Sequence, residues 1–216
     1  GVRCGFAWMN FDGVLGNKTL RQAILMAIDN DTICNSRTIG GLYTPGFSVL
    51  PSTLNYDYDK LENPYTYDPE KAKQILDDAG IVHFGYDETA VMDVKGIKVG
   101  LVGIYELYDH LEREQQLKDN IAKVKADGAQ LIVVIFHWGN ETETVPDSNQ
   151  TTLGRIAIDE GADLVCGHHP HVLQGIETYK GRNIVYSLGN FCFGGNSSPS
   201  DMDTMIYQQT FTIDAD

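Results

Sequence analysis

The chain has 216 residues, 42% hydrophobic and 21% charged, which is enough to bury the core of one large or two small domains. Its formal net charge is −14, with lysines and arginines scattered along the chain, which argues against nucleic acid as a partner. No apolar run reaches the length of a transmembrane helix, and residues 1–20 have no signal-peptide pattern.

The first part of the chain predicts two helices separated by a long loop. A short apolar strand is expected at residues 5–11. A helix follows in "TLRQAILMAIDND" (19–31), where the apolar residues share one helical face and Thr19 is placed as the N-cap. Residues 38–66 are rich in Gly, Pro, Tyr and Asn and are expected to form a loop.

The second helix is predicted in "DPEKAKQILDDAG" (68–80). Asp68 is its expected N-cap, Pro69 takes the first helical position, and Gly80 ends it.

Beyond about residue 97, strands alternate with helices. Buried strands are expected at 97–105, 130–136 and 162–167, with helices at 111–128 and near 150–161. This alternation is typical of βαβ units with parallel strands. The tail contains three further apolar segments that read as antiparallel strands, "VLQGIETYKG", "NIVYSLGNFCF" and "MIYQQTFTID". The sequence therefore predicts an α/β fold, with a mostly parallel central sheet flanked by helices and with C-terminal antiparallel strands.

Four cysteines, Cys4, Cys34, Cys166 and Cys192, lie far apart without a CxxC pair, which argues against a zinc knuckle or a thioredoxin-type site. We expect Cys166 and Cys192 to be buried thiols rather than a disulfide, because both lie in apolar, strand-like runs.

Histidines follow two of the predicted strands. His137 comes directly after residues 130–136, and "GHHPH" places His168, His169 and His171 directly after the strand that ends at Gly167. Because ligand sites of parallel α/β sheets form at the carboxyl ends of the strands, we expect all four histidines at one edge of the sheet.

The spacing of His169 and His171 would send both rings to one side of an extended segment, where they could hold one cation or phosphate. His168 would point the other way and support the site or pack. Glu141 and Asp163 are candidates to orient the ligating rings. The alternative is that these are strand-end histidines whose nitrogens bond backbone carbonyls.

Other polar residues give weaker signals. Asn190, in "SLGN", could reach a metal or phosphate or could serve only the turn. His83 and His110 stand alone in the sequence, and we expect them to be structural or exposed.

Residues 81–216 resemble the C-terminal half of the CapA family of poly-γ-glutamate capsule synthesis proteins. The matching stretches are "AGIVHFGYDETAVMDVKGIKVGLVGIY", "VVIFHWGNE", "GADLVCGHHPHVLQGIE" and "IVYSLGNFCF". That family is similar to calcineurin-like metallophosphatases, which implies a metallophosphatase-like half fold and a two-metal site.

The resemblance carries site residues with it. His137 matches the lone histidine after a core strand, His169 and His171 match the closing His-x-His ligand motif, and Glu141 matches the acidic residue of the HWGxE stretch. We therefore expect these four as metal ligands, with His137 and His169 also catalytic. From the sequence pattern itself, His168 and Asn190 are expected to support the site or touch substrate. The family pattern also implies a Gly-Asp strand end, an "NxE" segment and an "ANNH" motif earlier in the chain. None of these occurs here, and no histidine precedes His83.

Residues 5–80 resemble a different family, the oligopeptide- and dipeptide-binding proteins of ABC importers. "TLRQAILMAIDNDTI", "GGLYTPGFSVLP" and "YTYDPEKAKQILDDAG" carry this second resemblance. The chain thus resembles a chimera, engineered or natural, with segments 1–80 and 81–216 joined at "DDAGI". We expect the two segments to share one core.

Three functions follow from these patterns. The first is a CapA-like metal-dependent hydrolase domain with an incomplete site. It would hold one divalent Zn, Mn or Fe ion and take a small anionic or polyglutamate-type ligand. The second is a fragment of an extracellular peptide-binding protein, for which we expect no measurable peptide affinity. The third is a non-catalytic chimera. Both resemblances imply an extracellular or cell-envelope location, and the sequence does not predict the oligomeric state.

Overall fold

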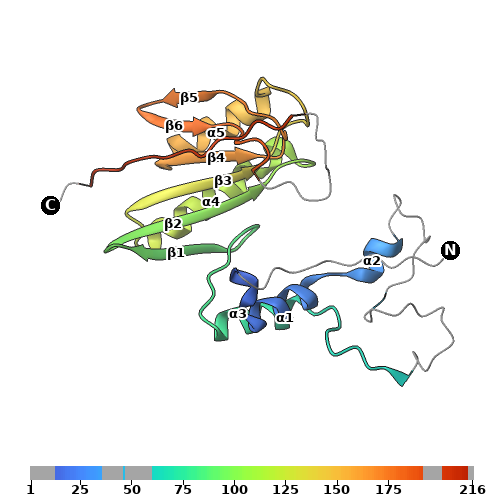
Figure 1. Ribbon diagram of the computed structural model, residues 1–216. Coiled ribbons are helices and arrows are strands. Elements are labelled where there is room, and N and C mark those ends of the chain that lie inside the picture. The colour runs from blue at the N-terminus through green and yellow to red at the C-terminus, as the bar shows by residue number, and fades with distance from the viewer. Residues whose placement is uncertain (1–12, 36–45, 47–59, 192–200, 214–216) are drawn as a thin grey trace. The chain divides into compact units, whose positions relative to one another are not determined.

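A computed structural model describes residues 13–35, 46, 60–191 and 201–213 (Figure 1). The expected strand at 5–11, Cys4, Cys192 and most of the expected loop at 38–66 lie outside these ranges. The chain divides into two compact units, residues 1–82 and 83–216.

In the described residues of the N-terminal unit, all regular secondary structure is helical. It contains a short 3-10 turn η1 (Val14–Gly16) and the helices α1 (Lys18–Ala27), α2 (Asn30–Asn35) and α3 (Pro69–Asp78). The helices α1 and α3 pack against each other through a buried cluster of Ala23, Met26 and Ala72.

The capping residues confirm one prediction and correct another. The Asp68 side chain accepts the backbone N–H of Lys71 at the start of α3, as expected. The N-cap of α1 is Asn17 rather than Thr19. The Asn17 amide oxygen accepts the N–H groups of Thr19 and Leu20, so that the helix begins one residue before the predicted cap.

The C-terminal unit is built on one six-stranded sheet in the order β1-β2-β3-β4-β6-β5 (Figure 1). Its strands are β1 (Thr89–Val94), β2 (Ile97–Tyr105), β3 (Leu131–His137), β4 (Leu164–His168), β5 (Ile176–Tyr179) and β6 (Arg182–Val185). β2, β3, β4 and β6 are parallel neighbours, whereas β1 and β5 pair antiparallel at the two edges. The predicted α/β class and mostly parallel sheet are confirmed.

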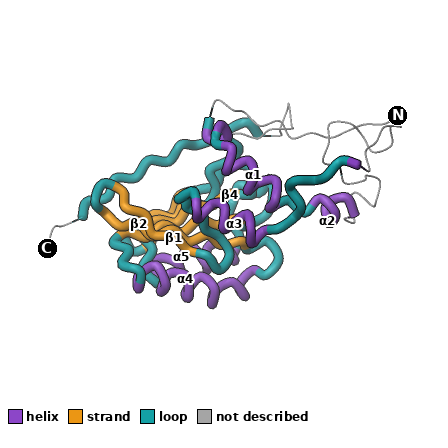
Figure 2. Tube along the Cα trace, turned by 90° about the horizontal axis from the view of Figure 1, so that it is seen from below, coloured by secondary structure: helices purple, strands orange, loops and turns teal. Residues whose placement is uncertain are grey.

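One face of the sheet is covered by α4 (Glu114–Ala126), which follows the short turn η3 (His110–Arg113), and by α5 (Ser148–Asp159) (Figure 2). Side chains of both helices join one buried core with the facing residues of the strands. Its largest fully buried members are Trp138, Phe136, Leu117, Ile121, Leu153 and Ile184. This apolar burial is the main source of stability for the unit.

The tail departs from the prediction of three antiparallel strands. β5 and β6 do pair antiparallel, but β6 also pairs parallel with β4. Residues 201–213 contain one bridge, Gly189 to Thr204, and no strand. The Asn183 amide donates to Tyr207 and Gln209, so side-chain bonds rather than a backbone ladder attach this segment to β6.

No helix within the described ranges is both long and apolar enough to cross a membrane.

Gly167 in β4 lies against a buried hydrogen bond between Trp138 and Tyr186. The Trp138 indole N–H donates to the Tyr186 carbonyl at 2.8 Å, and a Cβ on residue 167 would lie 2.2 Å from both atoms. Gly167→Ala should therefore lower the free energy of unfolding by about 3 kcal/mol. Urea unfolding followed by circular dichroism measures the change.

Gly175→Ala is the matched control, because nothing lies within 4 Å of a Cβ at that position. Equal urea midpoints for the two variants would contradict the assigned packing.

Candidate metal centre

Three aromatic side chains form a row across the carboxyl ends of the parallel strands. The register places Tyr105 of β2 opposite His137 of β3, and His137 opposite His168 of β4. The Tyr105 and His137 rings stack with centroids 5.3 Å apart and planes 5° apart. The Nδ1 atoms of His137 and His168 lie 3.0 Å apart, so one ring donates its Nδ1–H to the other.

The segment "HWGNE", residues 137–141, leaves β3 through a tight turn. The Trp138 side chain is fully buried in the core and anchors the start of the turn. Gly139 has a φ of 77°, and a Cβ there would lie 2.6 Å from the Gln150 amide. Only glycine fits this position, and the turn carries Glu141 out over the end of the sheet.

The loop "HPH", residues 169–171, follows β4. His169 and His171 have φ values of 103° and 60°, so the segment is not extended as expected, and strain is stored at this position. The Pro170 carbonyl accepts the Thr142 N–H at 2.8 Å, which ties the loop to the turn after β3.

Asn190 fixes the orientation of His171. Its amide oxygen bonds the His171 Nδ1 at 2.7 Å, and its amide nitrogen donates to the His171 carbonyl at 3.0 Å. With Nδ1 held in this way, Nε2 is the nitrogen that would face a metal.

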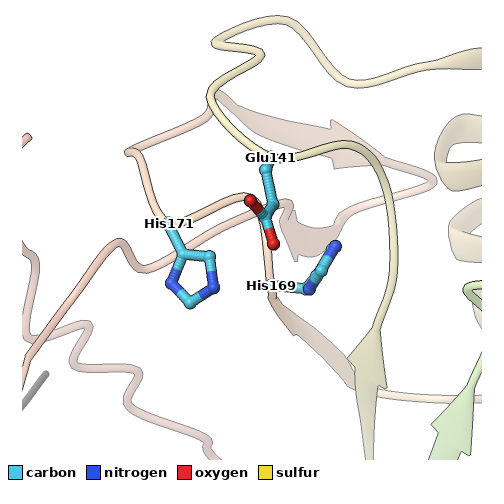
Figure 3. Close-up of side chains that lie close together, drawn as sticks. All are labelled: Glu141, His169 and His171. Atoms are coloured by element: carbon cyan, nitrogen blue, oxygen red, sulfur yellow. The ribbon is translucent and has the colours of Figure 1, made fainter. Parts of the chain in front are cut away.

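Glu141, His169 and His171 form a potential ligand cluster (Figure 3). One donor atom from each lies within 4.8 Å of the others. The Glu141 carboxylate points down between the two rings, from the opposite loop (Figure 3). His137 is not a member of this set, although its ring centroid lies 4.6 Å from that of His169.

The surroundings favour the neutral form of His137, His168 and His169. Partial burial lowers the pKa of His137 to about 4, and the neighbouring rings of His168 and His169 add to this effect. Desolvation also lowers the pKa values of His168 and His169. Neutral imidazole retains the lone pair that a metal ion needs.

Two buried glutamines brace the turn that carries Glu141. The Gln150 amide donates to the Gln174 side chain at 2.8 Å, and Gln174 donates to the Glu143 carbonyl at 2.9 Å. Gln150 also completes the capping box of α5 with Asp147. These hydrogen bonds therefore fix the beginning of α5 relative to the turn after β3.

Glu106 is a buried site residue that the sequence analysis missed. It directly follows β2 and is 1% exposed. Its carboxylate accepts the Gly139 N–H at 3.2 Å and bonds His110 Nδ1 at 2.7 Å, which raises the pKa of His110. The rule that singled out His137, a polar residue at a strand end, would also have found Glu106.

The remaining sequence candidates lie away from the ligand cluster. Asp163 precedes β4, at the opposite end of the strands, where it accepts the Ile132 N–H and pairs with Arg182. Its predicted role in orienting a ligating histidine is wrong. His83 pairs with Glu88 at 3.1 Å.

The fold and the cluster define an α/β domain with potential metal ligands at the carboxyl ends of parallel strands. Residues 64–195 match the family model described as "Bacterial capsule synthesis protein PGA_cap", and the chain belongs to this family. The chain is 32% identical over 177 residues to the PGA biosynthesis protein CapA of Bacillus subtilis (strain 168), a match covering 74% of the chain and 46% of the relative. It is 49% identical over 69 residues to the capsule biosynthesis protein CapA of Bacillus anthracis, covering 32% of the chain and 17% of the relative.

A second family matches the N-terminal part. Residues 1–95 match the model "Bacterial extracellular solute-binding proteins, family 5 Middle". The dipeptide-binding protein of Escherichia coli (strain K12) is 27% identical over 143 residues, covering 64% of the chain and 24% of that protein. The chain thus combines matches to two families, which overlap at residues 64–95, and it spans less than half the length of these relatives.

Cys166 lies on β4, and burial raises the pKa of its thiol to about 11. Because the thiolate is the reactive form, we expect Cys166 to resist iodoacetamide at pH 8 in the folded protein and to react readily in urea. Its alkylation rate should rise about tenfold for each pH unit between 8 and 10. Peptide mapping by mass spectrometry separates Cys166 from the other cysteines. Equal rates at pH 8 with and without urea would contradict this assignment.

Proposed function

We propose that this chain provides a divalent metal site to a capsule synthesis protein of the poly-γ-glutamate type. The ligands are Glu141, His169 and His171, and the metal binds an anionic group of the ligand. One observation carries the proposal: three donor atoms from two loops lie within 4.8 Å of one another. The orientation of His171 by Asn190 supports it.

The donor set suits the proposed ions. Two imidazoles and one carboxylate are the protein ligands of several catalytic zinc sites, and such sites leave one position open for water or substrate. Mn²⁺ and Fe²⁺ also accept this mixture of nitrogen and oxygen ligands. When bound, the ion would act as a Lewis acid on a phosphate or carboxylate oxygen of the ligand.

His137 and His168 are proposed to act on the ligand beside the metal. Their Nδ1 atoms share one proton at 3.0 Å, so the pair can hold or pass a proton at that position. The Tyr105 ring stacked on His137 restricts its rotation. Hydrolysis of the bound ester or amide is the activity that this arrangement favours.

The proposed location is extracellular or in the cell envelope. The description of the solute-binding family as extracellular and the capsule-related names of the relatives support it.

His169→Ala tests the metal site. Calorimetric titration with Zn²⁺ or Mn²⁺ should show one site in the unaltered protein. The variant should bind more than about 100-fold more weakly, since losing a ligand costs more than losing a residue that merely orients one. His83→Ala is the matched control, because His83 bonds Glu88 outside the cluster and should leave the affinity unchanged.

Equal metal affinity in the unaltered protein and in His169→Ala would refute the site. Release of phosphate from a phosphate monoester, present with metal and lost in His169→Ala, would extend the proposal from binding to hydrolysis.

The match of residues 1–95 makes peptide binding the second function to test, although we expect the chain to bind no peptide. A peptide site of this kind needs two lobes that close on the ligand, whereas the match covers 24% of the dipeptide-binding relative. We expect calorimetry with di- and tripeptides to give no heat of binding up to millimolar concentration. Micromolar binding of a short peptide would favour this second function.

A further inference from the structure

Three tyrosines cluster at the end of β2, beside His137. Tyr105, whose ring stacks on His137, has Tyr86 and Tyr108 as further neighbours, at centroid distances of 6.2 Å and 6.0 Å. Tyr86 is 63% exposed and Tyr108 is 80% exposed. Exposed aromatic rings next to polar side chains at a strand end are typical of ligand-binding surfaces rather than of a core.

The backbone holds Tyr86 in its outward position. Tyr86 has a φ of 53° because it is the first residue of a two-residue turn between Gly85 and Glu88. The buried Asn120 side chain, on α4, donates to the Tyr86 carbonyl at 2.7 Å and fixes this conformation. Gln116, on the same helix, donates to Asp87 at 2.6 Å.

A close backbone contact also fixes the loop before Tyr86. Gly85 packs against Gly103 of β2. A Cβ on residue 103 would lie 3.2 Å from the Gly85 Cα. Gly85 and Glu88 also exchange backbone hydrogen bonds across the two-residue turn that holds Tyr86 and Asp87, so the turn keeps the Tyr86 ring in a fixed place beside Tyr105.

We propose that Tyr86, Tyr105 and Tyr108 form a binding surface for an aromatic ring joined to a phosphate or carboxylate group. The inference rests on the proposed metal site, which takes the anionic group while the ring stacks on the tyrosines. His137 lies between the tyrosines and the proposed metal ligands, with its ring centroid 5.3 Å from that of Tyr105 and 4.6 Å from that of His169. The ligand therefore needs a spacer of a few atoms between ring and anion.

The stacking geometry favours an aromatic ring over an alkyl group. Tyr86 and Tyr108 each contact the Tyr105 ring and are largely exposed, so a ligand ring that reaches Tyr105 would meet further aromatic rings. Aromatic contacts of this kind stabilise a complex beyond the effect of buried area alone.

The test compares 3-phenylpropylphosphonate with 3-cyclohexylpropylphosphonate, which have the same anion, the same spacer and rings of similar size. Calorimetry on the Zn²⁺-loaded full chain should give a Kd about fivefold lower for the phenyl compound. Phenylphosphonate, which lacks the spacer, should bind no better than methylphosphonate. Tyr86→Ala and Tyr108→Ala should each bring the phenyl-to-cyclohexyl ratio close to one.

Tyr67→Ala is the matched control, because Tyr67 is 52% exposed and belongs to the N-terminal unit, so the ratio should be unchanged. Equal affinity for the phenyl and cyclohexyl compounds in the unaltered protein overturns the inference. So does the absence of phosphonate binding in a protein that still binds Zn²⁺. Loss of Zn²⁺ binding itself would instead refute the proposed metal site.

Discussion

The parallel register of β2, β3 and β4 is the constraint on which the candidate site depends. Parallel strands all end at the same edge, so the residue after each apolar run meets its neighbours without any long-range loop. Register pairs Tyr105 with His137 and His137 with His168. A slip of one residue in β3 would turn His137 towards the helices and Trp138 towards solvent, at the cost of the buried core.

Polar side chains, buried at Glu106, Gln150 and Gln174 and partly buried at Asn190, then fix the loops that extend beyond the strands. Glu106 accepts the Gly139 N–H, Gln150 and Gln174 bridge to Glu143, and Asn190 bonds His171. An unsatisfied buried polar group costs about 1–3 kcal/mol, so each of these groups strongly favours the one loop conformation in which its bonds form. In this way the two loops hold one donor atom each of Glu141, His169 and His171 within 4.8 Å of one another.

The elements of the C-terminal unit could be predicted because their signals are local. Apolar runs and helical faces identified β2, β3, β4, α4 and α5, and the position of His137 and His168 after two of these strands placed both at one edge. The edge strand β1 was not predicted. The conformation of the loops beyond the strands, and the contacts between them, could not be predicted. The left-handed backbone of His169 and His171 and the burial of Glu106 depend on contacts between segments far apart in the chain. The strand expected at 205–214 failed for a related reason, because side chains rather than a backbone ladder attach that segment.

The electrostatics of the site differ from those of the chain as a whole. A protein with a net charge of −14 repels anions at long range, and the lowered pKa values of His137, His168 and His169 favour uncharged rings at the site. An anionic ligand therefore gains little from the protein alone, and a divalent cation between Glu141 and the two histidines would reverse the local potential. The same acidic field attracts cations from solution. Metal binding would in this way precede ligand binding and make it possible, and the aromatic surface beside His137 would then select among the anions that the metal accepts.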